Sequence, residues 1–212
     1  MGVGIIVIAH LLLSAADVHA QPVAETPHTE DLVQQLRDFP ASFPAGVRSD
    51  GTVAPLEERR RAVYVQLRTL GSEALPALAR GLSDADVRIR RNVALFLGVA
   101  AGGWSEFSRP KLDIEPVLPA LIPAVADTDP RVRQLAAQAI GAIGPAGVSA
   151  VPSLVRLLAD SDEGSRNSAC IALRGIGPPA KEALEPLRKA LSDPSADVRQ
   201  FAQRAIQSIE GR

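Results

Sequence analysis

The sequence predicts an all-α protein, an α/α superhelix (solenoid) built from about four to five helix pairs. Three observations predict it. Hydrophobic residues make up 46% of the chain and aromatic residues only 3%, so Leu, Val, Ile and Ala must form the core. Such a composition suits close helix packing better than a β-sandwich. A short apolar pattern recurs four times, and a longer one follows each copy.

The first helix of each pair is predicted from four segments that align without gaps. They read LPALARGLSD (75–84), LPALIPAVAD (118–127), VPSLVRLLAD (151–160) and LEPLRKALSD (184–193). Each segment has an apolar residue at its first, fourth and eighth positions, and each ends in Asp. Offsets of 3, 4 and 7 residues mark one face of an α-helix.

The second helix of each pair is predicted from a wider apolar stripe. The clearest copy has apolar residues at Val132, Leu135, Ala136, Ala139, Ile140 and Ile143, and the copy that starts at Val198 repeats these spacings. Copies starting at Ile89 and Ser165 keep most of the pattern, and a partial copy spans 59–71. One pair cannot bury both stripes alone, so neighbouring pairs must stack. Gly-Pro steps such as Gly144-Pro145 end the second helices.

Charged residues are fixed to the same pattern. An Asp precedes an Arg by six residues in every copy: Asp84 and Arg90, Asp127 and Arg133, Asp160 and Arg166, Asp193 and Arg199. A row of Arg alone is typical of phosphate binding. The matching row of Asp favours paired charges inside the structure, and a ligand-binding Arg row remains the alternative.

This repeating pattern resembles the HEAT repeat family, in particular the short HEAT-like repeats of phycobilin lyases. The resemblance covers residues 56–212. It implies a right-handed superhelix with the second helices on the concave side. It also implies that the Asp and Arg rows bond between neighbouring repeats as a structural ladder.

The N-terminal end is predicted to be a signal peptide, residues 1–20. An apolar run, Gly4 to Leu13, precedes the small residues Val18-His19-Ala20. The run is about half of the roughly 20 residues that a membrane span needs. We therefore expect cleavage after Ala20, a secreted or periplasmic protein, and no stable membrane span after cleavage. The run lacks a preceding Lys or Arg, so an uncleaved anchor or a misassigned start stays open.

Residues 21–55 are predicted to form an N-terminal tail, a short helix and a loop that cap the repeats. The helix is expected over Glu30–Asp38, with Leu32, Val33 and Leu36 on one face. The HEAT-like repeat domain follows over 56–212. It contains an insert at about 102–114, because the first interval between the repeated Asp residues is 43 residues and the next two are 33.

Composition disfavours several functions. Without residues 1–20 the chain has 23 basic and 23 acidic residues, and this neutral balance argues against nucleic-acid binding. The three His are His10, His19 and His28, all before the repeats, and Cys170 is the single Cys. The repeats therefore lack a Ser-His-Asp or Cys-His arrangement and a His or Cys metal site. We expect no enzyme activity, no metal and no cofactor.

The expected function is an exported, non-catalytic scaffold that binds another protein or peptide. The alternative, which the resemblance implies, is a phycobilin lyase or lyase subunit. Insert residues are candidate contacts, since loops and aromatic residues often carry binding; Trp104 could instead fold back over the core. The polar side of the second helices is the other candidate surface, or an ordinary solvated face. The candidate residues are Trp104, Phe107, Arg109, Arg91, Gln134, Gln138, Asn167 and Gln200.

Overall fold

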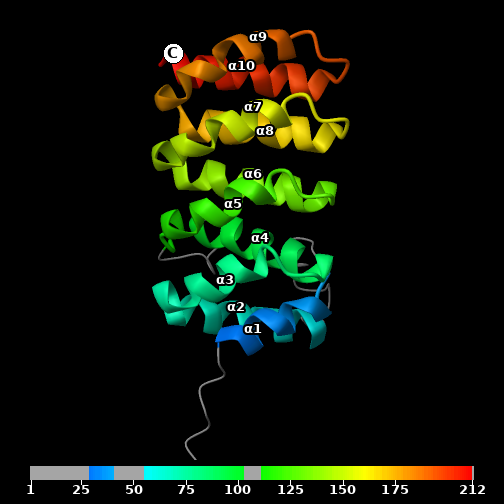
Figure 1. The fold of residues 1–212 in the computed structure, drawn as a ribbon, viewed down its shortest axis with the longest axis vertical. Coiled ribbons are helices and arrows are strands. Elements are labelled where there is room, and N and C mark those ends of the chain that lie inside the picture. Colours follow the sequence, from blue (N-terminus) through cyan, green and yellow to red (C-terminus); the bar gives the residue numbers. More distant parts are fainter. Residues whose placement is uncertain (1–28, 41–54, 103–110, 212) are drawn as a thin grey trace, which may run out of the picture.

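Helix pairs stack one above another along a single long axis (Figure 1). The computed structural model describes residues 29–40, 55–102 and 111–211. Every regular element within these residues is helical, which confirms the predicted fold class. The predicted contacts Trp104, Phe107 and Arg109 lie outside the described residues.

The elements follow the predicted order, with short helices alternating with long ones. The short A helices are α3 (Leu75–Gly81), α5 (Leu118–Ala124), α7 (Val151–Leu157) and α9 (Leu184–Ala190). The long B helices are α4 (Val87–Gly102), α6 (Pro130–Ile143), α8 (Glu163–Ile176) and α10 (Ala196–Glu210). Preceding them are α1 (Thr29–Gln35), the 3₁₀ turn η1 (Leu36–Asp38) and α2 (Pro55–Leu70). Further 3₁₀ turns lead into the A helices: η2 (Gly71–Ala74), η4 (Glu115–Val117), η5 (Gly144–Ala150) and η6 (Pro178–Ala183).

The B helices begin and end where local chemistry requires it. Asp129, Asp162 and Ser195 precede α6, α8 and α10, and each side chain accepts a hydrogen bond from the backbone N–H three residues on. Gly144 and Gly177 end α6 and α8 with positive φ angles of 77° and 70°, which a side chain would disfavour.

A long apolar stretch, Pro130–Leu157, has the length and composition to cross a membrane. In the structure it is divided into α6, η5 and α7, and the break falls at Gly144. Its apolar residues Leu135, Ile140 and Leu154 are fully or almost fully buried in the protein core.

The B helices pack directly against one another from α4 to α10. Helices α6 and α8 approach very closely: a Cβ atom on Gly175 would lie 2.3 Å from the carbonyl oxygen of Gly141, and one on Gly141 would lie 2.9 Å from Ala172 Cα. Small residues at this crossing therefore allow contact between backbones. Ala94, Ala137 and Cys170, one on each of three successive B helices, are also completely buried.

The predicted N-terminal helix is present as α1 and η1, and Leu32, Val33 and Leu36 are buried as expected. These elements contact α2, α3 and α4 together, so they form part of the first layer of the stack. Two buried side chains fix the end of the segment. Asn92 donates to the Phe39 carbonyl at 2.9 Å, and Arg60 donates to the Pro40 carbonyl at 3.0 Å.

Candidate functional site

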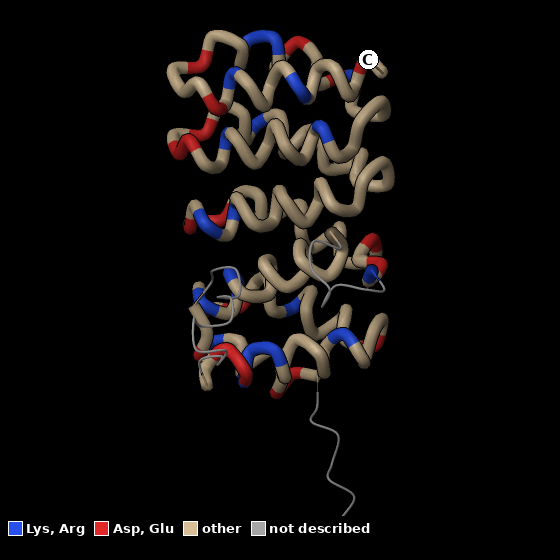
Figure 2. Tube along the Cα trace, turned by 180° about the vertical axis from the view of Figure 1, so that it is seen from behind, with Lys and Arg blue, Asp and Glu red and all other residues tan. Residues whose placement is uncertain are grey.

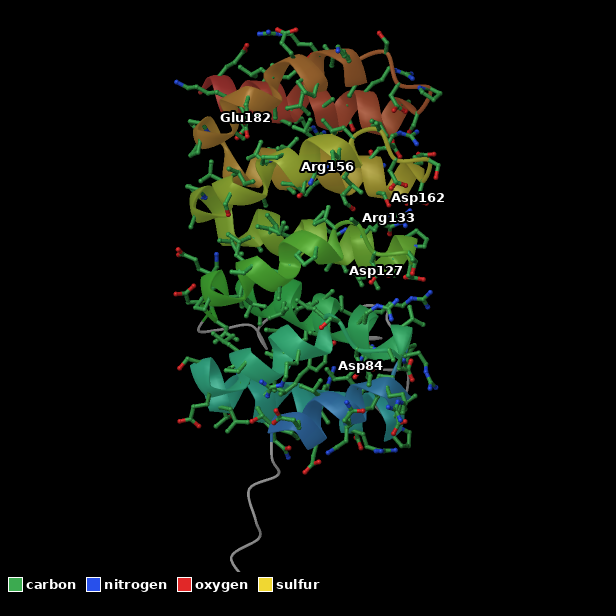
Figure 3. All side chains as sticks on the ribbon, viewed as in Figure 1. Asp84, Asp127, Arg133, Arg156, Asp162 and Glu182 are labelled. Carbon is green, nitrogen blue, oxygen red and sulfur yellow. The ribbon has the colours of Figure 1, made fainter. Side chains whose placement is uncertain are left out.

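A ladder of ion pairs runs along the edge of the stack where A helices turn into B helices. The Arg of one repeat pairs with the Asp of the next, as the ladder prediction requires. The three pairs are Arg90 with Asp127 at 2.8 Å, Arg133 with Asp160 at 2.9 Å, and Arg166 with Asp193 at 2.8 Å. Figure 3 shows Asp84, Asp127 and Arg133 in one column along the long axis.

Each ladder Arg also binds the turn of its own repeat. Arg133 Nη1 donates to the backbone carbonyl of Asp127 at 2.9 Å, and Arg166 Nη1 donates to that of Asp160 at 3.0 Å. The Asp side chains are equally occupied: Asp160 Oδ1 accepts the backbone N–H of Asp162 at 2.8 Å. One guanidinium therefore joins two consecutive turns, and one carboxylate both shapes a turn and receives the neighbouring Arg.

These contacts lower the pKa values of two ladder carboxylates, Asp127 and Asp193. Hydrogen bonds from Arg166 lower the pKa of Asp193, although burial opposes the shift. For Asp127, burial alone would raise the pKa, but the hydrogen bonds from Arg90 and from the Asp129 N–H outweigh it and the pKa is lowered. The charged forms of these carboxylates are thus stabilised by folding.

The ladder differs at its two ends. Asp84 accepts hydrogen bonds from the Asp86 N–H at 2.8 Å and from Gln34 Nε2 at 3.2 Å, and neither donor carries a charge. Arg199 donates to the carbonyls of Asp193 and Pro194 in its own turn. The four predicted Asp and four predicted Arg residues therefore yield three ion pairs in the described part of the chain.

A second row of contacts lies beside the ladder and uses residues that the sequence assigned to a partner. Arg91 Nε donates to Asp129 Oδ1 at 2.9 Å, and Gln134 Nε2 donates to Asp162 Oδ2 at 2.8 Å. Gln138 reaches Ser168 on the next B helix at 3.3 Å. These three side chains join neighbouring repeats, a role that the sequence analysis did not assign to them.

The sequence analysis also missed the acceptors of this second row. Asp129 and Asp162 lie two residues after a ladder Asp, and each caps a B helix while it accepts the row contact. The signal was present as Asp-x-Asp, at 127–129 and again at 160–162.

Two further predicted contacts remain on the surface of the described chain. Gln200 on α10 is exposed. Asn167 on α8 is half-buried, and its Oδ1 atom is covered without a hydrogen-bond partner. Partner binding by these two residues stays a prediction.

The B helices distribute charge unevenly along their length. Glu163 and Asp197 lie in first turns, and beyond those turns the B helices carry one carboxylate, Glu210, which pairs with Arg188 at 3.2 Å. Arg174 and Arg204 are exposed and form no ion pair within the described chain. In the upper rows of Figure 2, most red segments lie toward one side of the stack, while blue segments also occur along the helices.

We call five exposed or half-exposed polar side chains of these helices the B-helix surface. It comprises Arg131, Gln138, Arg174, Gln200 and Arg204. Arg131 hydrogen-bonds Gln134 at 3.2 Å, and the guanidinium of Arg204 lies 5.7 Å from the ring centre of Phe201. The surface therefore offers guanidinium and amide donors with little compensating negative charge.

Two kinds of reactive site are relevant to function, a free thiol and a metal-binding cluster of side chains. Cys170 is a free thiol, and burial raises its pKa to about 12. Within 29–40, 55–102 and 111–211, no three His, Cys, Asp or Glu side chains are grouped to hold a metal ion.

Comparison with known families agrees with this geometry. The model of the family described as HEAT repeats matches residues 100–174 and again 118–210, which together are more than half of the chain. The protein belongs to the HEAT repeat family. No curated protein matches its sequence.

Solved structures with a similar fold include both natural and designed repeat proteins. The complex of CpcE and CpcF of phycocyanin lyase from Nostoc sp. PCC7120 matches with a TM-score of 0.56 and 23% identity, over 72% of this chain and 90% of that one. A computationally designed armadillo repeat protein for modular peptide recognition gives 0.56 and 24%, over 85% and 82%. The archaeal HEAT-like repeats protein from Thermococcus onnurineus NA1 gives 0.53 and 15%, over 86% and 66%. At these identities the likeness concerns the fold.

Proposed function

We propose that this protein is a non-catalytic scaffold that binds another protein through the B-helix surface. One observation carries the proposal: beyond their first turns the B helices present Arg174, Arg204 and amide side chains, with Glu210 as the one carboxylate. Guanidinium and amide groups are common at protein interfaces, where Arg in particular is enriched. Their charge is not neutralised by ion pairs within the described chain, so a partner can supply the missing acceptors.

The comparisons support a binding role in general terms. One similar structure was designed for modular peptide recognition, and another is a complex of two chains. The near-neutral sequence, with a formal net charge of −1, favours a protein partner over nucleic acid. The absence of His after His28 supports a non-catalytic role.

The structure changes which residues should be mutated to test this function. Reversing the charge of Arg91 would break its pair with Asp129 and disturb the repeat junction. Arg174 and Arg204 are better targets, because neither forms an ion pair in the described chain. We expect Arg174→Glu with Arg204→Glu to abolish capture of the protein's partner from the exported fraction of the native organism. Trp104→Ala tests the insert in the same assay.

The control is Lys189→Glu, an exposed charge reversal on α9. Circular dichroism of every variant should match the wild type. Proteins that bind the wild type and Lys189→Glu but not the double variant, identified by mass spectrometry, would support the proposal. Equal capture by all variants would refute it for the B-helix surface.

Export is part of the proposal and rests on residues 1–20. We propose that this segment is a cleaved signal peptide and that the protein functions outside the cytoplasm, with no membrane span after cleavage. Cell fractionation followed by N-terminal sequencing should find a chain that begins at Gln21. A cytoplasmic protein that retains Met1 would contradict it.

A bilin lyase, or a lyase subunit, is the second candidate, and the similarity to the phycocyanin lyase complex favours it. Absorbance spectra of the protein titrated with a free bilin distinguish the two functions. A scaffold should leave the bilin spectrum unchanged. A saturable spectral shift would instead support the lyase reading.

A further inference from the structure

The ladder ends on an Arg without a following Asp, at the end of the stack that α9 and α10 form (Figure 1). Inside the stack, each paired Arg donates through Nη1 to carbonyls of its own turn and through its other nitrogens to the Asp of the next repeat. Arg199 makes the first of these contacts, to the carbonyls of Asp193 at 2.7 Å and Pro194 at 2.9 Å. Its Nε and Nη2 atoms form no hydrogen bond with any described residue.

The contacts that orient Arg199 also orient the three paired Arg residues. In all four turns Nη1 lies 2.7–3.0 Å from the carbonyl oxygen of the Asp six residues earlier. Arg199 also interacts electrostatically with the Asp193 side chain, which Arg166 holds through hydrogen bonds of 2.8 and 3.0 Å. Arg90 interacts with Asp84 in the same way and still pairs with Asp127. The guanidinium of Arg199 is therefore oriented as its equivalents are when they bind a carboxylate.

Inside the stack, such an Arg meets an Asp-x-Asp turn. The sequence contains three Asp-x-Asp segments, and in each segment both carboxylates accept contacts from two side chains of a neighbouring layer. The two side chains are Arg90 with Arg91 at 127–129, Arg133 with Gln134 at 160–162, and Gln34 with Arg37 at 84–86. An Arg together with an Arg or a Gln therefore binds every Asp-x-Asp turn of this chain.

Arg199 and Gln200 form one more donor pair of this kind, but without an Asp-x-Asp turn. They repeat the dipeptide of Arg133 and Gln134, which binds the turn at 160–162. Both Arg199 and Gln200 are exposed. Within the described chain, neither side chain forms an ion pair or a hydrogen bond with a carboxylate. The end of the stack thus presents donors whose acceptors are defined by the inner repeats.

The missing turn is expected from a different protein, not from a second copy of this chain. In a second copy, all three Asp-x-Asp turns already bind side chains of that copy. Full stacking of another helix pair is disfavoured as well. At the positions equivalent to Gln203, the inner helices have Ala137 and Cys170, which are completely buried, whereas Gln203 is exposed. This longer polar side chain suits a stack end that faces water, so the occupant contacts the turn edge at Arg199 and Gln200.

We propose that this end of the stack is a docking site for a different protein that presents an Asp-x-Asp turn. The first carboxylate of the turn binds Nε and Nη2 of Arg199, and the second accepts a hydrogen bond from the Gln200 amide. The inference goes beyond the proposed function, since Arg199 lies outside the B-helix surface and Gln200 is the one side chain that the two sites share.

NMR spectroscopy of the ¹⁵N-labelled full chain tests the proposal, because the Arg Nε–H and Gln side-chain amide signals report on these two donors. The probe is a synthetic peptide with the sequence of residues 157–166, LLADSDEGSR, with both ends blocked. The control peptide, LDLASDEGSR, has the same composition and charge but no Asp-x-Asp. We expect the probe to shift the Nε–H signal of Arg199 saturably, with a Kd at least about fivefold below that of the control peptide.

Gln200→Ala and Arg199→Gln are the test variants, and Gln207→Ala is the matched control, because Gln207 is exposed further along α10. Arg199→Gln should abolish the preference for the Asp-x-Asp peptide, and Gln200→Ala should weaken its binding about two- to threefold. Gln200→Ala removes no side-chain hydrogen bond within the described chain, so it tests the site without disturbing the turn that Arg199 holds.

Equal Kd values for the two peptides, or equal effects of Gln200→Ala and Gln207→Ala, would overturn the proposal. Arg174→Glu should leave peptide binding unchanged, because Arg174 lies more than two turns, about 12 Å, along α8 from Arg166, the equivalent of Arg199. Loss of partner capture in Arg174→Glu without loss of peptide binding would separate the two sites, so each site can fail without the other.

Discussion

At the scale of single residues, the repeated Asp has two roles that can be separated. Asp160 Oδ1 accepts the Asp162 N–H, which shapes the turn, and it also accepts Arg133 Nη2 from the previous repeat. Both side chains of the ion pair are largely shielded from water, with 14% of Arg133 and 17% of Asp160 exposed. Loss of one partner leaves the other desolvated and unpaired, which costs more than the net value of the pair.

We expect Asp160→Ala to lower the free energy of unfolding by about 2–3 kcal/mol, because both contacts are lost. Asp160→Asn should cost less, since its amide oxygen can still accept the Asp162 N–H. Urea denaturation measures both, with Asp197→Ala as the control because Asp197 is exposed and forms no ion pair in the described chain. If Asp160→Ala and Asp197→Ala unfold alike, the pair with Arg133 has no stabilising role.

The sequence predicted the ladder but not the row of contacts beside it, and the reason is physical. A fixed Asp-to-Arg spacing shows that two opposite charges recur together. When the repeats stack, such charges come close enough to form ion pairs. Gln134 and Arg91 recur at the same helix position without an obvious complement, so they looked available to a partner. Their acceptors, Asp162 and Asp129, lie outside the Asp-to-Arg spacing, and the structure shows that they also cap the B helices.

At the scale of helices, the junction between α6 and α8 depends on the absence of side chains. A Cβ on Gly175 would lie 2.3 Å from Gly141 O, where backbone cannot yield, whereas one on Gly98 would lie 3.8 Å from its nearest neighbour, Ala139. These two glycines therefore provide a matched pair within one stack. Both are helical, so both substitutions gain the same intrinsic helix propensity.

Gly175→Ala is expected to destabilise the protein by about 1–3 kcal/mol, because α8 must move away from α6. Gly98→Ala should be neutral or should stabilise by up to about 1 kcal/mol. Thermal melts followed by circular dichroism compare the two variants directly. A Gly175→Ala protein as stable as Gly98→Ala would show that the two helices can separate without cost.

Helix positions followed from apolar spacing, because a 3.6-residue period identifies a buried stripe wherever the stripe is packed. The placement of α1 and η1 did not. Leu32, Val33 and Leu36 showed that a helical face is buried, but not against which elements. Asn92 and Arg60 donate hydrogen bonds to the backbone carbonyls of Phe39 and Pro40 and so hold this segment. Every residue has a backbone carbonyl, so residue types do not identify these acceptors.

At the scale of the whole molecule, the stability of a repeat protein is approximately a sum over the interfaces between neighbouring repeats. Carboxylates in the turns contribute to several of these interfaces. The pKa values of five carboxylates in these turns are lowered: Asp86, Asp127, Asp129, Asp162 and Asp193. A carboxylate whose pKa is lower in the folded state contributes stability above its unfolded pKa, about 3.9 for Asp. That contribution is lost as the pH falls through the lower, folded value.

We therefore expect the melting temperature to be level near neutral pH and to fall as the pH drops below about 4. In Asp193→Asn the decline should be shallower, since Arg166 no longer loses a charged partner on acidification. The melting temperatures of the two proteins should accordingly converge at low pH. Parallel curves from pH 7 to pH 3 would contradict the assignment of this acid sensitivity to the Arg166 pair.

The reactivity of the buried Cys170 thiol can report how often the structure around it opens. The side chain is completely covered, and it senses the charges of both Arg166 and Asp193, the pair that joins α8 to the last repeat. A thiol with a pKa of about 12 is almost unreactive at neutral pH while it is covered. Alkylation of native protein therefore requires an opening of the packing around α8 that exposes Cys170. Unlike a global melt, the alkylation rate reports local opening around a single side chain.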